Sequence, residues 1–122
     1  MNKVETTLGG VNNDENIAIL TGKSENYEYK DGKRLGDSPI GMKYNVVLPG
    51  NRLNGLTVKV AGADQLQQIS DEQIGEAISS RKFILVRFTN CKVSIYNIDD
   101  SMIMSAFAKS VELVKPEGAK TA

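Results

Sequence analysis

The 122-residue sequence predicts a mainly β domain of the α+β class, built as a small, half-open antiparallel barrel with one helix between its third and fourth strands. Short runs of branched and aromatic residues alternate with turn signals, which is typical of antiparallel strands. Only one stretch combines helical spacing with a good N-cap. The resulting order is about three strands, one helix and two or three strands. The OB-fold barrel uses this order, and a generic α+β sandwich with the helix on one face of its sheet fits it as well.

The domain is expected to span residues 16–115. The first strand begins near Ile17, in the run NIAILTG. Residues 1–15 are rich in Gly, Asn and Thr and have no sustained period, so they predict a flexible N-terminal segment. Residues 116–122 predict a disordered tail.

Two hairpins follow the first strand. Asp31 and Gly32 form a hairpin-turn signal. The next hairpin is KYNVVLPGNRLNGLTVKV, residues 43–60, in which apolar side chains recur at every second position on both sides of a Pro-Gly-Asn turn. One face of each strand should therefore meet the core, and Lys43 and Lys59 should lie together on the opposite face.

The helix is predicted within ADQLQQISDEQIGEAISSRK, where Ser70 or Asp71 is a suitable N-cap and isoleucines recur at helical spacing. The strand-forming run FILVRFTNCKVSIYNID comes next, with a bulge or turn at Asn90 and Cys91. The last run, SMIMSAFAKSVELV, predicts one or two closing strands with a kink at Ala108 and Lys109.

Composition removes most enzyme classes. The chain has no histidine, and Cys91 is its only cysteine, so imidazole catalysis, internal disulfides and thiolate zinc sites are excluded. We find no phosphate-binding or dinucleotide-binding glycine motif. The apolar runs are a few residues long, whereas a membrane span needs about 20. We therefore expect a cytoplasmic, non-enzymatic protein without cofactor, metal or membrane contact.

The net charge is zero, but the charge is unevenly distributed. Residues 29–60 carry six bases and two acids, and residues 81–96 carry four bases and no acid. Acidic blocks separate them. Either the basic and acidic blocks pair with each other across the surface, or the two basic blocks fold together into one electropositive face while the acidic residues lie on the opposite side. Single-stranded nucleic acid needs such a face, together with aromatic rings on which bases stack.

The candidate nucleic-acid-binding residues combine cations for phosphate with two tyrosines for stacking. They are Tyr29, Lys43, Arg52, Lys59, Arg81, Lys82, Arg87, Lys92 and Tyr96. Simpler interpretations exist for several of them. Arg81 and Lys82 follow the helix, where cations interact favourably with its dipole. Arg87 and Lys92 on an edge strand would oppose aggregation. Arg52 lies in a turn whose asparagine and glycine residues are ordinary for turns.

Three stretches resemble the YdcP or HelP-like helicase processivity factors of Gram-positive conjugative elements. They are Ile19-Leu20-Thr21-Gly22, the hairpin strands Met42 to Val46 and Gly55 to Val60, and the ending Ser105 to Val114. The resemblance implies an OB-like domain that binds single-stranded DNA and assists a relaxase and helicase during conjugative DNA processing. The chain departs from that family at Ala61-Gly62-Ala63, where a proline is expected, and in its longer acidic helix.

The sequence thus favours a sequence-tolerant binder of single-stranded DNA, an accessory to mobile-element replication. Its first rival is a protein-protein interaction module whose basic hairpin docks onto a relaxase, a coupling protein or a second copy, which leaves a homo-oligomer open. Its second rival is a structural accessory protein of a mobile element or phage without nucleic-acid binding.

Overall fold

The computed structural model describes residues 2–13, 17–36, 38–99 and 101–114, so the predicted tail at 116–122 lies outside the described residues. The strands are β1 (Asn2–Thr7), β2 (Ile17–Asn26), β3 (Tyr29–Lys30), β4 (Lys33–Arg34), β5 (Gly41–Leu48), β6 (Asn54–Ala61), β7 (Ile84–Thr89), β8 (Lys92–Ile98), β9 (Ser101–Ala108) and β10 (Ser110–Leu113). The helices are α1 (Leu8–Val11), α2 (Asp71–Ser79) and the 3-10 turn η1 (Pro49–Asn51).

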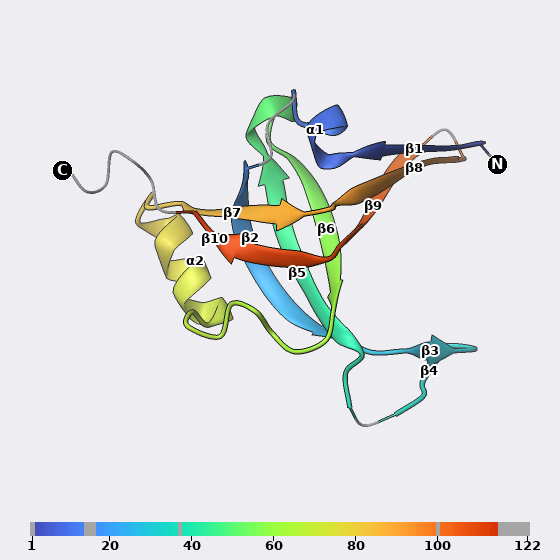
Figure 1. The fold of residues 1–122 in the computed structure, drawn as a ribbon, viewed down its shortest axis with the longest axis horizontal. Coiled ribbons are helices and arrows are strands. Elements are labelled where there is room, and N and C mark those ends of the chain that lie inside the picture. The colour runs from blue at the N-terminus through green and yellow to red at the C-terminus, as the bar shows by residue number, and fades with distance from the viewer. Residues whose placement is uncertain (1, 14–16, 37, 100, 115–122) are drawn as a thin grey trace.

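Eight of these strands form one strongly curled, half-barrel sheet in the order β1-β8-β9-β6-β5-β2-β7-β10 (Figure 1). The predicted mainly β class is confirmed. β6 pairs with β9 in parallel, whereas an antiparallel barrel was predicted, because the chain passes through α2, β7 and β8 before it returns beside β6. The other strand pairs are antiparallel.

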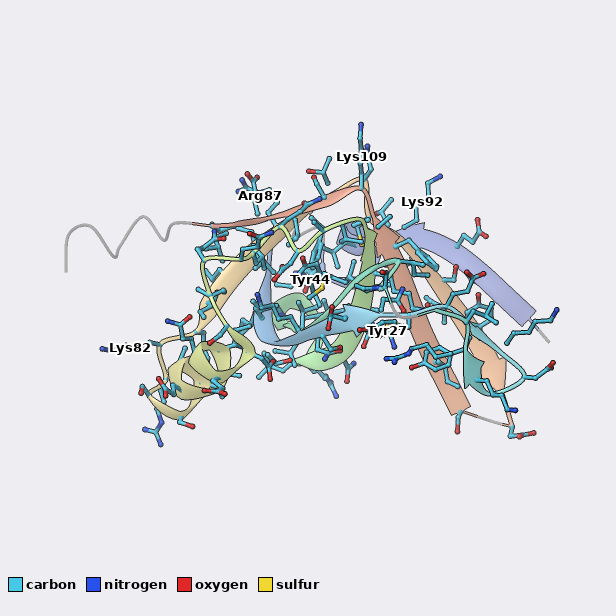
Figure 2. The ribbon with its side chains drawn as sticks, turned by 90° about the horizontal axis from the view of Figure 1, so that it is seen from below. Tyr27, Tyr44, Lys82, Arg87, Lys92 and Lys109 are labelled. Atoms are coloured by element: carbon cyan, nitrogen blue, oxygen red, sulfur yellow. The ribbon has the colours of Figure 1, made fainter. Side chains whose placement is uncertain are left out.

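The β5–β6 hairpin forms the middle of the sheet and follows the predicted alternation. Tyr44, Val46 and Leu48 of β5 are buried, and so are Leu56, Val58 and Val60 of β6. Tyr44 lies in the middle of the domain (Figure 2). Because side chains alternate along a strand, the residues between these positions point to the outer face of the sheet.

Two breaks bend the chain in the curled sheet, one between β7 and β8 and one between β9 and β10. β7 ends at Thr89 and β8 begins at Lys92, with Asn90 at a φ of 51°. β9 ends at Ala108 and β10 begins at Ser110, as the expected kink predicts. The Lys109 amide donates to the Thr89 carbonyl at 2.9 Å, so the two breaks lie side by side. Each run therefore bends once, and both bends occur at the same level of the sheet.

Helix α2 begins at the predicted cap. The Ser70 hydroxyl accepts a hydrogen bond from the Gln73 amide, and the Gln73 side chain accepts one from the Ser70 amide, which forms a capping box. At the other end, the Lys82 amide donates to the Ala77 carbonyl and Arg81 has a φ of 60°. This is a Schellman ending with arginine at the position where glycine is usual. Among the described residues, no helix has the length and apolarity to cross a membrane.

Flexibility was predicted for residues 1–15, but the part of this segment that the structure describes, residues 2–13, contains regular structure. Residues 2–7 form β1, which pairs with β8 along its whole length, and Leu8 of α1 is 1% exposed in the core. The run NKVETT contains one apolar residue and no clear alternation. Pairing with β8 and the anchor at Leu8 explain why it is a strand, and neither was visible in its composition.

Candidate nucleic-acid interface

Four residues line up across the outer face of the sheet, each on a different strand. Lys43 of β5 is the register partner of Lys59 of β6, Lys59 is the partner of Phe107 of β9, and Phe107 is the partner of Lys92 of β8. We call these four residues the Lys-Phe row. Neighbouring strands lie about 4.8 Å apart, so the row spans about 14 Å from β5 to β8.

The row places like charges together. Lys43 and Lys59 are directly opposite each other, an arrangement that costs stability in an antiparallel pair. Neither they nor Lys92 form an ion pair with a carboxylate in the part of the chain that the structure describes. The Lys59 ammonium lies 5.4 Å from the centroid of the Phe107 ring, within cation–π range. Phe107 is 59% exposed, so its ring is available to a ligand.

The surface beside the row is polar and slightly hollow. The Thr57 hydroxyl donates to the Asn45 side-chain oxygen at 2.7 Å, and the Thr21 hydroxyl donates to the Asn45 carbonyl at 3.0 Å. These side chains line a depression of about 260 Å³, together with Gly55 and Met104. Asn45 and Thr57 are register partners two positions from Lys43 and Lys59, so the depression adjoins the row.

A partly buried network behind β5 fixes the strand that carries Lys43. The ammonium of Lys23 forms an ion pair with Asp64 and donates to the Leu66 carbonyl at 2.8 Å. The Tyr44 hydroxyl donates to Asp64 at 2.8 Å and accepts from the Gln65 amide at 3.1 Å. The connection after β6 is therefore fixed against the inner side of the strand that carries Lys43.

The same network sets the charge of Asp64. Burial alone favours the protonated carboxyl, but hydrogen bonds from Lys23, the Leu66 amide and Tyr44 outweigh burial and lower the pKa of Asp64 below its usual range. Burial raises the pKa of the Tyr44 hydroxyl, so this group stays protonated and keeps its donor role. Both groups act structurally, on the inner side of the sheet.

The β3–β4 hairpin projects from the body of the domain and carries a second group of cations and aromatic rings (Figure 1). Asp31 and Gly32 both have positive φ, as the predicted two-residue turn requires. Tyr29 is 58% exposed, and the Arg34 guanidinium lies 4.4 Å from the centroid of the Tyr27 ring. The hairpin thus offers an exposed ring and an arginine stacked on a second one.

Several predicted cations lie away from the row. Arg52 sits in the turn at the far end of the β5–β6 hairpin, about 16 Å along the strands from the Lys43–Lys59 pair. Arg81 and Lys82 follow α2, and Figure 2 shows Lys82 at the opposite side of the domain from Lys92. Arg87 of β7 faces Glu112 of β10 at 3.6 Å. The structure thus brings Lys43, Lys59 and Lys92 together, but not these four residues.

The second predicted stacking residue, Tyr96, is half-buried on β8 opposite Ile103 of β9. Its parity along β8 is that of Lys92, so it lies on the outer face of the sheet beyond the row. Sequence reasoning missed Phe107 and Arg34 as site residues. Alternation within SMIMSAFA, residues 101–108, was the available signal for Phe107. Apolar side chains occur at both odd and even positions of this strand, so the pattern did not show which face is exposed.

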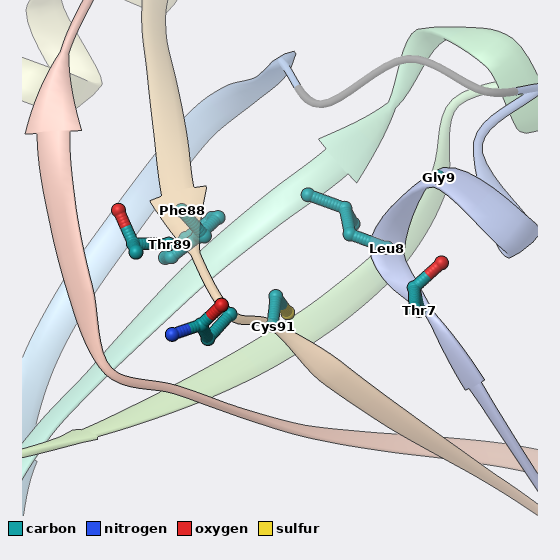
Figure 3. A pocket seen from close by; sticks show the side chains of 7 residues that line it. Thr7, Leu8, Gly9, Phe88, Thr89 and Cys91 are labelled. Atoms are coloured by element: carbon teal, nitrogen blue, oxygen red, sulfur yellow. The ribbon is translucent and has the colours of Figure 1, made fainter.

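A pocket of about 360 Å³ lies between the α1 region and the break after β7 (Figure 3). Leu8, Phe88 and Cys91 contribute its apolar lining. Burial raises the pKa of the Cys91 thiol to about 11, so the thiol is protonated at neutral pH and is a poor nucleophile. Within the described ranges, no cluster of three or more His, Cys, Asp or Glu side chains is arranged to hold a metal ion.

Comparison with known proteins identifies no relative. No protein-family model matches the chain, and no curated protein or solved structure matches it with significant similarity.

Proposed function

We propose that this chain is a non-enzymatic, sequence-tolerant single-stranded DNA-binding protein that holds the strand on the outer face of β5, β6, β9 and β8. The observation that carries the proposal is the Lys43–Lys59 pair with exposed Phe107 next to it in register. A local arrangement that costs stability is expected at a functional site, and a bound phosphate removes the repulsion between the two ammonium groups.

An OB-fold-like domain is the proposed scaffold. Apart from β1 and the β3–β4 hairpin, the strands that precede α2 are β2, β5 and β6, and the bent pairs β7–β8 and β9–β10 follow it. β2 pairs with both β5 and β7, while β6 pairs with β9. Since β10 continues β9 and pairs with β7, the pairings lead around the barrel and back to β2. OB-folds bind oligonucleotides on the face of their second and third strands and on the flanking loops. In the proposed scaffold these two strands are β5 and β6.

The chemistry of the face suits an unpaired strand. Row lysines supply point charges for phosphates, and Phe107 supplies a stacking surface worth about 1–3 kcal/mol per base. Tyr29 and the Arg34–Tyr27 pair on the hairpin provide further rings and charge. Stacking and phosphate contacts are sequence-tolerant, because every base has a π-face and every nucleotide a phosphate. Three row cations in a chain of zero net charge predict modest, salt-sensitive affinity.

The resemblance to conjugative helicase processivity factors extends this proposal to the cellular role. Under it, the chain is a cytoplasmic accessory of a relaxase and helicase in mobile-element DNA processing. Single-stranded DNA released by the helicase is then the ligand of the outer face.

A protein-interaction module is the second candidate, and the turn after β5 favours it. Arg52 and Leu53 are exposed at positive φ, 53° and 60°, a conformation that is costly for side chains other than glycine and asparagine. The turn is held by the buried Asn12 side chain, which accepts from the Gly50 amide at 2.7 Å. Arg52→Glu then abolishes capture of a protein partner and leaves oligonucleotide binding unchanged.

Fluorescence anisotropy with a labelled single-stranded oligonucleotide tests the proposed function. The wild type should bind it more tightly than the corresponding duplex, and Lys59→Glu should weaken binding strongly because it places a carboxylate in the row. Lys82→Glu is the matched control, with the same charge change at the end of α2, and should bind nearly as the wild type does. Equal effects of the two variants, or no binding by the wild type, would contradict the proposal.

A further inference from the structure

The depression beside the Lys-Phe row differs from the row in its chemistry. Among the described residues, those that line it are all uncharged, and they combine hydrogen-bonding side chains with apolar surface from Val47 and Met104. The lysines of the row attract phosphate, but nothing in the depression does. A few placed polar groups on an apolar lining are typical of a site for a neutral organic group. The depression therefore suits a flat, uncharged ring.

The side-chain amide of Asn45 is held in one orientation. The Thr57 hydroxyl donates to Asn45 Oδ1 at 2.7 Å, which places the oxygen toward β6 and the Nδ2 amino group toward β2. On that side Nδ2 lies 3.7 Å from the place that a Cβ of Gly22 would occupy, so this glycine leaves it uncovered. No described residue accepts a hydrogen bond from Nδ2, and no described buried side-chain nitrogen lacks a partner. Nδ2 is thus a positioned donor that is open to solvent.

A bulge in β2 adds an acceptor. The register between β2 and β5 shifts between Leu20 and Gly22, so Thr21 is the extra residue of the bulge. Its hydroxyl donates to the Asn45 carbonyl at 3.0 Å. Bulges often re-aim a side chain at a functional site. Because the hydroxyl protons of Thr21 and Thr57 are both used, the lone pairs of these two oxygens remain to accept.

Gly55 leaves room for a ring over the sheet. It has the outward parity of Thr57 and Lys59 on β6, and a Cβ added to it would meet nothing nearer than the Val46 carbonyl oxygen at 4.0 Å. A glycine inside a strand often marks the close approach of a ligand. Met104 also lines the depression, and a thioether packs favourably against aromatic rings.

We propose that the depression is a subsite for one unpaired nucleobase of the strand held by the Lys-Phe row, a role that rests on the proposed DNA binding. It lies two residues, about 7 Å, along the strands from the Lys43–Lys59 pair. Asn45 Nδ2 donates to the Watson–Crick edge of the base, and the threonine oxygens accept from it. All four bases have a donor and an acceptor on this edge, so the subsite requires a base without selecting one.

The subsite gives the protein a reason to favour single strands. Phosphates are exposed in single-stranded and duplex DNA alike, so the row lysines attract both forms. The Watson–Crick edges are free in a single strand, whereas in a duplex the complementary strand occupies them. A base can therefore enter the depression only from an unpaired strand.

Gly55→Val tests the subsite, because it fills the depression with a strand-favouring side chain and changes no charge. Anisotropy measures binding of three labelled probes: a single strand, a base-free strand with the same sugar-phosphate backbone, and the duplex. The variant should bind the single strand about tenfold more weakly, as expected for the loss of one base contact, and the other two probes as the wild type does. Lys59→Glu should weaken binding of all three, since each contains phosphates.

Gly75→Val is the matched control. It also adds a side chain to an exposed glycine with open space around it, but on α2, and should bind every probe as the wild type does. Thr57→Val is a second test, because it removes the hydroxyl that orients Asn45, and it should weaken binding of the single strand alone. A circular dichroism melt of each variant shows that the fold is retained.

The results separate the subsite from the proposed function. If Gly55→Val and Thr57→Val bind the single strand as the wild type does while Lys59→Glu weakens binding, the subsite is wrong and the binding face stands. Equal weakening of all three probes by Gly55→Val also overturns the subsite, because a phosphate contact is then what changed. A wild type that binds none of the probes overturns both proposals.

Discussion

Replacing Phe107 with alanine removes the only ring of the Lys-Phe row and changes no charge. Phe107 is 59% exposed, and full burial of a phenylalanine side chain stabilises a protein by about 1.5–3 kcal/mol, so the substitution should cost only about 1 kcal/mol of stability. The cation–π contact with Lys59 is exposed and adds at most a similar amount. The variant should therefore fold.

The effect on binding should be larger. Loss of one stacked base costs about 1–3 kcal/mol, which corresponds to an affinity about 5- to 140-fold lower. Titration of a labelled oligonucleotide at several salt concentrations measures it. The slope of log K against log salt should stay unchanged, because no phosphate contact is lost. Phe107→Trp should retain most of the affinity, since it keeps a stacking surface.

Phe83→Ala provides the matched control. Phe83 is 51% exposed, close to the value for Phe107, but it precedes β7 and lies outside the row. It should leave affinity within about twofold of the wild type, as expected for a surface change away from the ligand. If both alanine variants weaken binding equally, or if Phe107→Ala has no effect, the stacking role assigned to Phe107 is wrong.

Three further predictions concern charge and stability. Lys43→Gln and Lys59→Gln should each make the salt slope of DNA binding shallower by about 0.7, as measured by anisotropy; an unchanged slope would remove that lysine from the phosphate contacts. Asp64→Asn should cost about 2 kcal/mol in urea denaturation at neutral pH, less than the loss of a partner from a fully buried ion pair, because the side chains of Lys23 and Asp64 are 10% and 19% exposed and Lys23 keeps its hydrogen bond to the Leu66 carbonyl. Since the folded pKa of Asp64 is lowered, the ion pair stabilises the fold above the ordinary value of 3.8, and this contribution is lost as the pH falls through the folded pKa. The wild type and Asp64→Asn should therefore converge in stability in acid, and a constant gap between them would refute the assignment. Ser70→Ala should cost about 1 kcal/mol in the same assay, because it removes the N-cap of α2, and a value near zero would show that the cap does not contribute.

Local patterns predicted the features of the fold that depend on neighbouring residues. Alternation and the length of the turn after Leu48 were enough to place Lys43 and Lys59 on one face, because a hairpin fixes its own register. The cap at Ser70 and the turn at Asp31 and Gly32 were equally local.

Long-range pairing determined what local patterns did not show. Phe107 joins the row only because β9 returns parallel to β6 after the crossover through α2. Arg87 has a carboxylate beside it because β10 places Glu112 in register with it. β1 was missed because it is a strand through its pairing with β8, which lies about 90 residues further along the chain; Thr6, for example, pairs with Val93. A single sequence contains no signal for any of these three registers.

The most direct test of the proposed interface is the set of backbone amide signals that shift in an NMR titration with a short single-stranded oligonucleotide. We predict that the shifts concentrate on β5, β6, β9 and β8 around Lys43, Lys59, Lys92 and Phe107, with smaller changes in the β3–β4 hairpin. Shifts that concentrate on α2 and the Arg81–Lys82 end, or an unchanged spectrum, would contradict the proposal that the outer face binds the strand.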